Sequence, residues 1–181
     1  MVLILMGPMG CGKTTIGKML AEKLGWPFHD ADDFHPKENV EKMRAGVALT
    51  DEDRKTWLDT LHAMIEGWVE RGQNMILACS VLKQSYREAL GVNQTTVRTV
   101  YLKGSYDLIR KRIEGRHHPY MDKNLLRSQF DTLEEPTDGL WVDISPPPET
   151  IVNTLRPALI DPQLPVVPAM RRRRPATAMK K

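Results

Sequence analysis

One segment of the sequence has glycines, a lysine and a threonine at the spacing of a phosphate-binding loop. Residues 7–14 read Gly-Pro-Met-Gly-Cys-Gly-Lys-Thr, which fits the pattern G-x-x-x-x-G-K-[ST]. Glycines allow backbone N–H groups to approach phosphate oxygens closely, and we expect Lys13 to reach the β- and γ-phosphates of ATP. The Thr14 hydroxyl is a hard oxygen donor of the kind that Mg²⁺ prefers. The predicted ATP-binding residues are Gly7, Pro8, Met9, Gly10, Cys11, Gly12, Lys13, Thr14 and Thr15. Cys11 is interpreted as a small filler, with a redox-sensitive loop as the alternative.

Acidic side chains follow the next predicted strand, which covers residues 26–29. They are Asp30, Asp32 and Asp33. The carboxyl ends of parallel strands meet at one edge of a sheet, so these acids should lie beside the phosphate-binding loop. One carboxylate can accept the proton of an attacking hydroxyl while another holds Mg²⁺ through water. We assign Asp32 to the hydroxyl and Asp30 to the metal; the reverse assignment and a purely turn-forming role are the alternatives.

Arginines lie between the fourth and fifth predicted strands, where small P-loop kinases keep a lid. They are Arg110, Arg112 and Arg116, within a predicted lid over about residues 110–124. Arginines that close over a nucleotide stabilise charge on the transferred phosphoryl group while the lid excludes water. The predicted catalytic residues are therefore Lys13, Asp32, Arg112 and Arg116. The alternative for the arginines is a solvated basic face of a helix.

The pattern of apolar residues predicts an α/β fold that positions these groups. Short apolar runs predict strands near residues 2–6, 26–29, 75–79, 97–102 and 140–143. Helical periodicity and capping signals predict helices over residues 15–24, 36–45, 50–71, 83–90, 106–114, 125–133 and from about 148 to 159. Strands that alternate with helices imply right-handed crossovers. We expect a three-layer P-loop kinase fold with a five-stranded parallel sheet between helices and a helical lid.

The charge of the chain is divided between a body and a tail. The 181 residues carry a formal net charge of +3, and residues 161–181 hold six basic residues and one acidic residue. The tail is therefore +5 and residues 1–160 are −2, so the body has no basic surface by composition and nucleic acid is an unlikely partner. Four prolines and no helical pattern predict a disordered tail after a single domain over residues 1–160. A nucleic-acid, membrane or targeting role for the run 171–174 is the alternative.

Cysteine usage and hydropathy exclude several other classes. Cys11 and Cys79 are too far apart in sequence for zinc-ligand spacing, and two cysteines are too few for a disulfide-stapled secreted domain. The apolar run at residues 2–6 is too short for a signal peptide or a membrane span. We therefore expect a cytoplasmic protein without a membrane-spanning segment.

Three spaced blocks of the sequence resemble the gluconokinase family. The first is Asp30-x-Asp32-Asp33-x-His35-Pro36, Asn39, Lys42-Met43, Gly46, Leu49-Thr50-Asp51-x-Asp53-Arg54 and Trp57-Leu58. The others are Cys79-Ser80-x-Leu82-Lys83 with Tyr86-Arg87, and Leu125-Leu126-x-Ser128-Gln129-Phe130-x-x-Leu133-Glu134-x-Pro136. The resemblance spans about residues 2–155. It implies transfer of the γ-phosphate of ATP to the 6-hydroxyl of D-gluconate on a fold like that of shikimate and nucleoside-monophosphate kinases, and it implies a homodimer.

The residues themselves suit a sugar acid, which needs a cation for its carboxylate and polar groups for its hydroxyls. The acceptor half supplies the cations Lys42, Arg54, Lys83 and Arg87. Arg54 is the preferred carboxylate partner because a guanidinium can bind bidentately, with pairing to Asp51 or Asp53 as the alternative. The predicted hydroxyl-binding residues are Asp32, His35, Asn39, Ser80 and Gln129. His35 has the alternative role of capping the helix that begins at Pro36.

The sequence departs from the family pattern at two places. Ala31 replaces the glycine that usually separates the first two acids, and Pro119 stands where the lid pattern Arg-x-x-His-Phe-Met has its histidine. We therefore assign no catalytic role to a lid histidine. Two rival functions follow from the same residues: another small-molecule kinase of this fold, such as one for shikimate, and a nucleotide-binding module that engages nucleic acid through the tail.

Overall fold

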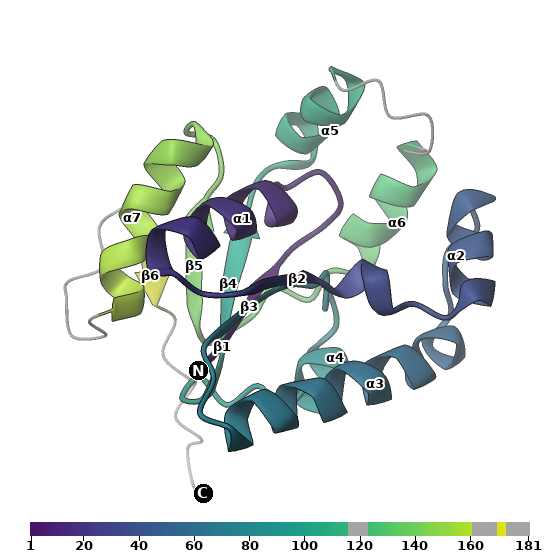
Figure 1. The fold of residues 1–181 in the computed structure, drawn as a ribbon. Helices are drawn as coiled ribbons and strands as arrows, with labels where there is room; N and C mark the ends of the chain where they lie inside the picture. The colour runs from purple at the N-terminus through teal and green to yellow at the C-terminus, as the bar shows by residue number, and fades with distance from the viewer. Residues whose placement is uncertain (116–122, 161–169, 173–181) are drawn as a thin grey trace, which may run out of the picture.

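The fold is built on a single sheet whose first five strands are parallel, as predicted (Figure 1). The computed structural model describes residues 1–115, 123–160 and 170–172. The strand order is β2-β3-β1-β4-β5-β6. The strands are β1 (Val2–Met6), β2 (Phe28–Asp30), β3 (Met75–Ala78), β4 (Val97–Lys103), β5 (Leu140–Asp143) and β6 (Met170–Arg172).

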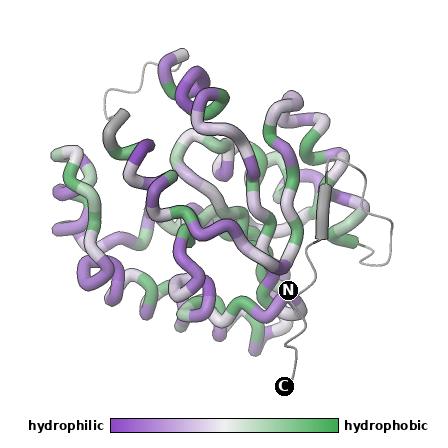
Figure 2. The backbone as a smooth tube through the Cα atoms, turned by 180° about the vertical axis from the view of Figure 1, so that it is seen from behind, coloured by the Kyte–Doolittle hydropathy of each residue, from purple (hydrophilic) through white to green (hydrophobic). Residues whose placement is uncertain are grey.

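Helices cover both faces of this sheet and complete the three predicted layers. They are α1 (Lys13–Leu24), the 3₁₀ helix η1 (Ala31–Phe34), α2 (Lys37–Arg44), α3 (Asp51–Glu70), α4 (Gln84–Ala89), α5 (Tyr106–Glu114), α6 (Lys123–Thr132) and α7 (Pro148–Ile160). Leu3 and Leu5 of β1 face a core that includes α1 and α7, whereas Val2, Ile4 and Met6 face a core that includes α3. Hydrophobic residues follow the central strands, and the helices around them alternate in hydropathy (Figure 2).

The sequence predicts the end of α1 and the start of α3, the two helices that flank the site, whereas α1 begins at Lys13, two residues before its predicted start. Gly25 ends α1 in the left-handed region, with φ of 66°. Thr50 and Asp53 form a reciprocal capping box at the start of α3: the Thr50 hydroxyl accepts from the Asp53 N–H, and the Asp53 carboxylate accepts from the Thr50 N–H. These local signals fix the first turn of α3, and with it the position of Arg54.

The tail differs from the prediction over three residues. Met170–Arg172 form β6, which pairs antiparallel with β5, so not all of residues 161–181 lacks structure. Without β6, β5 would be an edge strand with unpaired backbone groups. Backbone pairing of this kind needs no apolar pattern, so the sequence of these three residues carries no strand signal. The rest of the tail lies outside the described residues, as do residues 116–122 of the predicted lid, including Arg116. No helix in the described ranges is long and apolar enough to cross a membrane.

Candidate active site

The phosphate-binding loop connects β1 to α1 and relies on three glycines. Gly7, Gly10 and Gly12 have φ values of 142°, 76° and 104°, all in the left-handed region. A Cβ on Gly10 would lie 2.7 Å from Cγ1 of Ile113. A side chain at this position would therefore clash with Ile113 and would also strain the backbone, whose φ is positive. The loop thus brings its backbone to the N-terminus of α1, where unpaired N–H groups and the helix dipole favour a phosphate.

Cys11 packs beneath this loop as a filler. Its side chain is fully buried, and a Cβ on Gly7 would lie 2.9 Å from its sulfur. Burial raises the pKa of the Cys11 thiol, which opposes formation of a reactive thiolate. The structure therefore favours the filler interpretation over a redox-sensitive loop.

Strand register brings Asp30 to the phosphate-binding loop. Leu5 of β1 and Asp30 of β2 both pair with Ala78 of β3, so the three strands end at one level of the sheet. The Thr14 hydroxyl donates to Oδ2 of Asp30 at 2.7 Å. Two hard oxygen ligands thus lie together at the end of the loop, and oxygen ligands of this kind are those that Mg²⁺ prefers.

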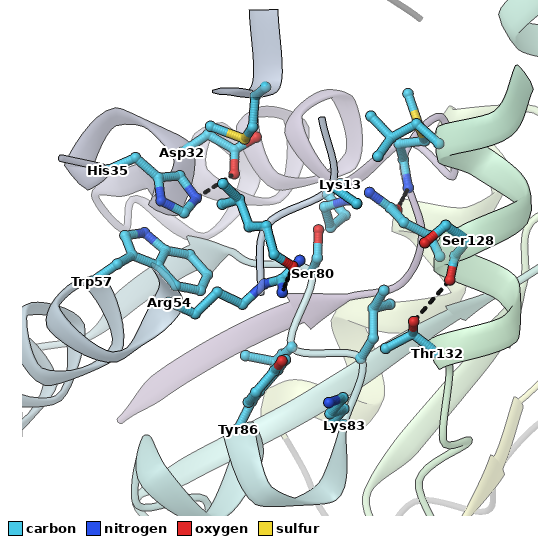
Figure 3. A pocket seen from close by; sticks show the side chains of 18 of the residues that line it. Lys13, Asp32, His35, Arg54, Trp57, Ser80, Lys83, Tyr86, Ser128 and Thr132 are labelled. Atoms are coloured by element: carbon cyan, nitrogen blue, oxygen red, sulfur yellow. Dashed lines mark hydrogen bonds and ion pairs between the residues drawn. The ribbon is translucent and has the colours of Figure 1, made fainter. Parts of the chain in front are cut away.

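Lys13 and Asp32 face the same space from opposite sides (Figure 3). Lys13 Nζ donates to the carbonyls of Gly7 and Pro8 at 3.0 and 3.2 Å. The Asp32 side chain is 68% exposed to the cleft. Desolvation by the surrounding protein raises the pKa of the Asp32 carboxyl; Lys13 opposes the rise, and Asp30 and Asp33 add to it. The carboxylate is therefore accessible to a ligand and more basic than a free aspartate.

A cleft of about 500 Å³ joins the phosphate-binding loop to an acceptor region. Its wall comes from the loop, η1, residues 47–49, α3, the segment after β3, and α6. Thirteen of the predicted site residues line it: Met9, Gly10, Gly12, Lys13, Thr14, Thr15, Asp30, Asp32, His35, Arg54, Ser80, Lys83 and Gln129. Gly7, Pro8, Cys11, Asn39, Lys42, Arg87 and Arg112 are not among the residues that form the wall.

His35 is held in the wall by an aromatic stack. Its ring lies 4.3 Å from that of Trp57 with an angle of 11° between the planes, and the Trp57 Nε1–H donates to the Ala31 carbonyl at 2.8 Å. His35 makes no capping bond to α2, so the capping alternative does not hold. Desolvation, with help from Arg54, lowers the pKa of His35 to about 4. The imidazole is therefore neutral at physiological pH.

The four predicted cations differ sharply in their surroundings. Lys83 Nζ donates to both carboxylate oxygens of Asp51 at 2.7 Å, and Lys42 Nζ pairs with Asp53 at 2.6 Å. Arg87 is 3% exposed and donates to the carbonyls of Val81 and Leu82, so it supports the segment after β3 from inside the protein.

Arg54 is the fourth predicted cation. Its guanidinium donates to the carbonyls of Leu49 and Thr50 and lies 5.6 Å from the centre of the Tyr86 ring. The carboxylates of Asp51 and Asp53, considered as its possible partners, bond the two lysines instead. Arg54 therefore lies in the wall of the cleft and forms no ion pair within 4.0 Å with either of these acids, although its charge helps to lower the pKa of the Asp51 carboxyl.

Two other predicted residues connect elements around the nucleotide side. Gln129 of α6 accepts a hydrogen bond from the Met9 N–H at 2.6 Å, which ties α6 to the phosphate-binding loop. Arg112 of α5 donates to the Ile144 carbonyl in the turn between β5 and α7. Both side chains thus position segments that border the loop.

Several wall residues were not predicted as site residues. They are chiefly Asp51, Trp57, Tyr86, Ser128 and Thr132. The first four belong to the sequence blocks that resemble gluconokinases, but residue type and spacing alone did not indicate a role for them. Thr132 follows Ser128 by one helical turn, and its hydroxyl donates to the Ser128 carbonyl at 2.8 Å. That spacing on one face of α6 is the signal that could have identified it.

Comparison with known proteins decides between the kinases that share this loop. A family model described as Shikimate kinase matches residues 9–141. A probable gluconokinase of Mus musculus is 44% identical over 153 residues, covering 75% of this chain and 83% of that protein. The thermoresistant gluconokinase of Escherichia coli is 37% identical over 155 residues, covering 83% and 89%. This chain belongs to the gluconokinase family.

Solved structures agree with membership of the gluconokinase family. A gluconokinase from Sinorhizobium meliloti superposes with a TM-score of 0.73 at 35% identity, covering 84% of this chain and 87% of that one. Shikimate kinase from Aquifex aeolicus superposes with a TM-score of 0.53 at 22% identity, covering 88% and 96%. The second likeness concerns the fold alone, so the predicted P-loop kinase fold is confirmed by both and the gluconokinase assignment by the first.

Proposed function

We propose that this chain transfers the γ-phosphoryl group of ATP to the 6-hydroxyl of D-gluconate, giving 6-phospho-D-gluconate and ADP. The observation that carries the proposal is one cleft that contains the phosphate-binding loop, an accessible carboxylate at Asp32 and a cation at Arg54. A six-carbon sugar acid has its carboxylate and its primary hydroxyl at opposite ends. The cleft offers a partner for each end, and the identity to gluconokinases supports the same substrate.

The phosphate half of the cleft accounts for ATP binding. Backbone N–H groups of Gly10 and residues 12–14 would surround the phosphates, because Pro8 has none and those of Gly7, Met9 and Cys11 donate within the protein. Lys13 would exchange its two loop carbonyls for phosphate oxygens. Thr14 and Asp30 would hold Mg²⁺, with Asp30 acting through water. Mg²⁺ neutralises charge on the phosphates when it is bound. We also propose that Arg112 and Arg116, within the predicted lid at residues 110–124, stabilise charge on the transferred phosphoryl group. Their positive charge is the support for this role.

The acceptor half accounts for activation of the hydroxyl. Asp32 accepts the proton of the 6-hydroxyl as its oxygen bonds to the γ-phosphorus, and the bond from that phosphorus to the β,γ-bridging oxygen breaks to release ADP. Desolvation of Asp32, which raises its pKa, makes it a better proton acceptor. The step depends on position as much as on basicity, because the hydroxyl must lie in line with the leaving ADP.

The acceptor half also accounts for recognition of a carboxylate. Of the four predicted cations, Lys42 and Lys83 are paired with carboxylates and Arg87 is buried behind the wall. Arg54 lines the cleft, and its hydrogen bonds in the described part of the chain go to backbone carbonyls. A monoanionic substrate therefore matches Arg54, which of these four cations is the one that lines the cleft without a carboxylate partner, and Ser80 and Gln129 offer polar groups for hydroxyls.

A substrate comparison tests this function. ADP release is measured with D-gluconate, with shikimate and with no acceptor, at equal ATP and Mg²⁺. Turnover with D-gluconate well above the other two is expected. Turnover with shikimate at or above the gluconate rate would overturn the proposal. Two further expectations stay predictions: a homodimer, which the resemblance implies, and a cytoplasmic location, which the cysteine usage and hydropathy predict. Light scattering after size-exclusion chromatography tests the first.

A further inference from the structure

His35 lies beside Asp32 in the cleft at a spacing that suits a shared ligand. His35 Nε2 is 4.0 Å from Oδ1 of Asp32 (Figure 3). This is too long for a direct hydrogen bond. A hydroxyl oxygen placed between them can lie about 2.8 Å from both atoms, which is ordinary hydrogen-bond distance. The pair thus has room for one hydroxyl, provided that one atom donates and the other accepts.

The hydrogen bonds behind His35 decide which ring nitrogen carries the proton. Asn39 Nδ2 lies 3.5 Å from His35 Nδ1 and donates to the Asp53 carbonyl at 2.7 Å. A carbonyl can only accept, so it fixes the orientation of the Asn39 amide with its NH₂ group toward His35. Nδ1 faces a donor and must accept, which leaves the proton on Nε2. Asn39 is 4% exposed, so water does not compete for this arrangement.

The surroundings of the ring keep it neutral and immobile. The side chain of His35 is 4% exposed, and Trp57 stacks against its face. Arg54 of α3 and Asp32 of η1 are the charged groups that face it, with opposite signs. Burial and Arg54 both disfavour the imidazolium, and they lower the pKa of His35 to about 4. The ring is therefore held as a neutral donor rather than as an ion-pair partner of Asp32.

We propose that His35 and Asp32 form a two-sided holder for the attacking hydroxyl. His35 Nε2–H donates to the hydroxyl oxygen and Asp32 accepts its proton. One lone pair of the oxygen then remains free to point at the γ-phosphate. Asn39 is a positioning residue, because it sets the tautomer of His35 without reaching the cleft. The inference rests on the proposed function, which supplies the hydroxyl, but the tautomer itself is a property of the protein alone.

Imidazole ¹⁵N NMR tests the tautomer without any activity. The chain has five histidines, and the His35 signals are assigned as those lost in His35→Gln. We expect a neutral ring protonated on Nε2 between about pH 6 and pH 8. A ring protonated on Nδ1, or a doubly protonated ring in this range, would overturn the proposal whether or not D-gluconate is the substrate.

Kinetics test the hydrogen bond to the substrate. His35→Ala removes the donor, and kcat/KM for D-gluconate should fall about 10- to 100-fold because the hydroxyl is misplaced. His35→Gln keeps an N–H donor on a side chain of similar length and should recover part of the loss, with KM for ATP unchanged in both. The matched control is His29→Ala, which removes a comparable stack on Trp68, at 5.5 Å and 6°, at a residue outside the cleft wall.

The outcomes separate this proposal from the function on which it rests. Equal losses in His35→Ala and His35→Gln, together with a similar loss in His29→Ala, would indicate a merely structural role and overturn the holder. Wild-type kinetics in both His35 variants would also overturn it while leaving gluconate phosphorylation intact. If His35→Ala fails to fold, the glutamine variant and the NMR experiment decide. Absence of gluconate turnover in the wild type would instead count against the proposed function.

Discussion

The two halves of the cleft are built in different ways. The phosphate half is one continuous segment, residues 7–14, whose geometry depends on glycine φ angles and on the strand and helix at either end. The acceptor half is assembled from η1, α3, the segment after β3, and α6. In the first half the backbone does the binding. In the second half the function depends on which charged side chains are already paired with each other.

This difference explains why the two halves are not equally visible in the sequence. A loop that binds through its backbone is specified mainly by neighbouring residues, so a short motif identifies it even though Asp30 and Gln129 contact it from other elements. In the acceptor half, Lys83 pairs with Asp51 across 32 positions of sequence, and this pairing decides that Lys83 is not an open cation. Variants in the two halves should therefore affect the binding or reaction of different substrates.

The largest expected effect is that of Asp32→Asn. Loss of a positioned proton acceptor should lower kcat by about 10²- to 10⁴-fold. Because Asp32 belongs to the acceptor half, binding of ATP measured by calorimetry should persist. Near-normal turnover of this variant would show that Asp32 is not the proton acceptor. Loss of ATP binding would show that the acceptor half also contributes to nucleotide binding.

Lys13→Ala tests the phosphate half. Removing a cation aimed at the developing phosphoryl charge should lower kcat by about 10²- to 10³-fold. Steady-state kinetics with each substrate varied in turn should show KM for D-gluconate nearly unchanged. A rise in the KM for D-gluconate as large as the rise for ATP would show that the halves are not separable.

The acceptor half should also make the protein sensitive to acid through His35. In the folded chain the pKa of His35 is about 4, against an ordinary value of 6.5. As the pH falls below about 6.5, His35 binds a proton in the unfolded chain but not in the folded chain. The free energy of unfolding therefore decreases between about pH 6.5 and pH 4. The maximum contribution is on the order of 3 kcal/mol. Urea unfolding across this range should show a smaller loss in His35→Gln than in the wild type, and parallel profiles would contradict the assignment.

Arg54→Gln should act on one substrate only. Hydrogen bonds to charged groups are worth about 1.5–3 kcal/mol, so KM for D-gluconate should rise about 10- to 100-fold while KM for ATP stays constant. Lys42→Gln is the matched control. It removes a cation near the acceptor half that is already paired with Asp53. The KM for D-gluconate should therefore change by no more than about threefold. A larger effect for Lys42→Gln than for Arg54→Gln would reverse the assignment of the carboxylate partner.

The smallest expected effect concerns the tail. Deleting residues 170–181 removes β6 and exposes the edge of β5, which should speed amide hydrogen exchange in residues 140–142 that pair with it. β6 is not among the described elements that form the cleft wall, so kcat and both KM values should match the wild type. Unchanged exchange in β5 would contradict the pairing, and altered kinetics would add the tail to the site.

Much of the fold was predictable because its signals are local. The buried runs of β1 and β3, Gly25 at the end of α1, and the capping box at Thr50 and Asp53 all depend on neighbouring residues. β6 was not predictable, because its three residues contribute backbone pairing to β5 from a region without apolar pattern. The same limit applies to the site: Arg87 has the type and position of a substrate ligand, yet it is buried against the carbonyls of Val81 and Leu82.

The position of the phosphate on the product shows how D-gluconate lies in the cleft. We propose that the acceptor half places the primary hydroxyl of D-gluconate at Asp32 while Arg54 holds the carboxylate at the other end. The product of ATP and D-gluconate is examined by ¹H–³¹P correlation NMR. We expect phosphorus to couple to the two methylene protons on C6. Coupling to a proton of any other carbon, or formation of inorganic phosphate alone, would contradict it.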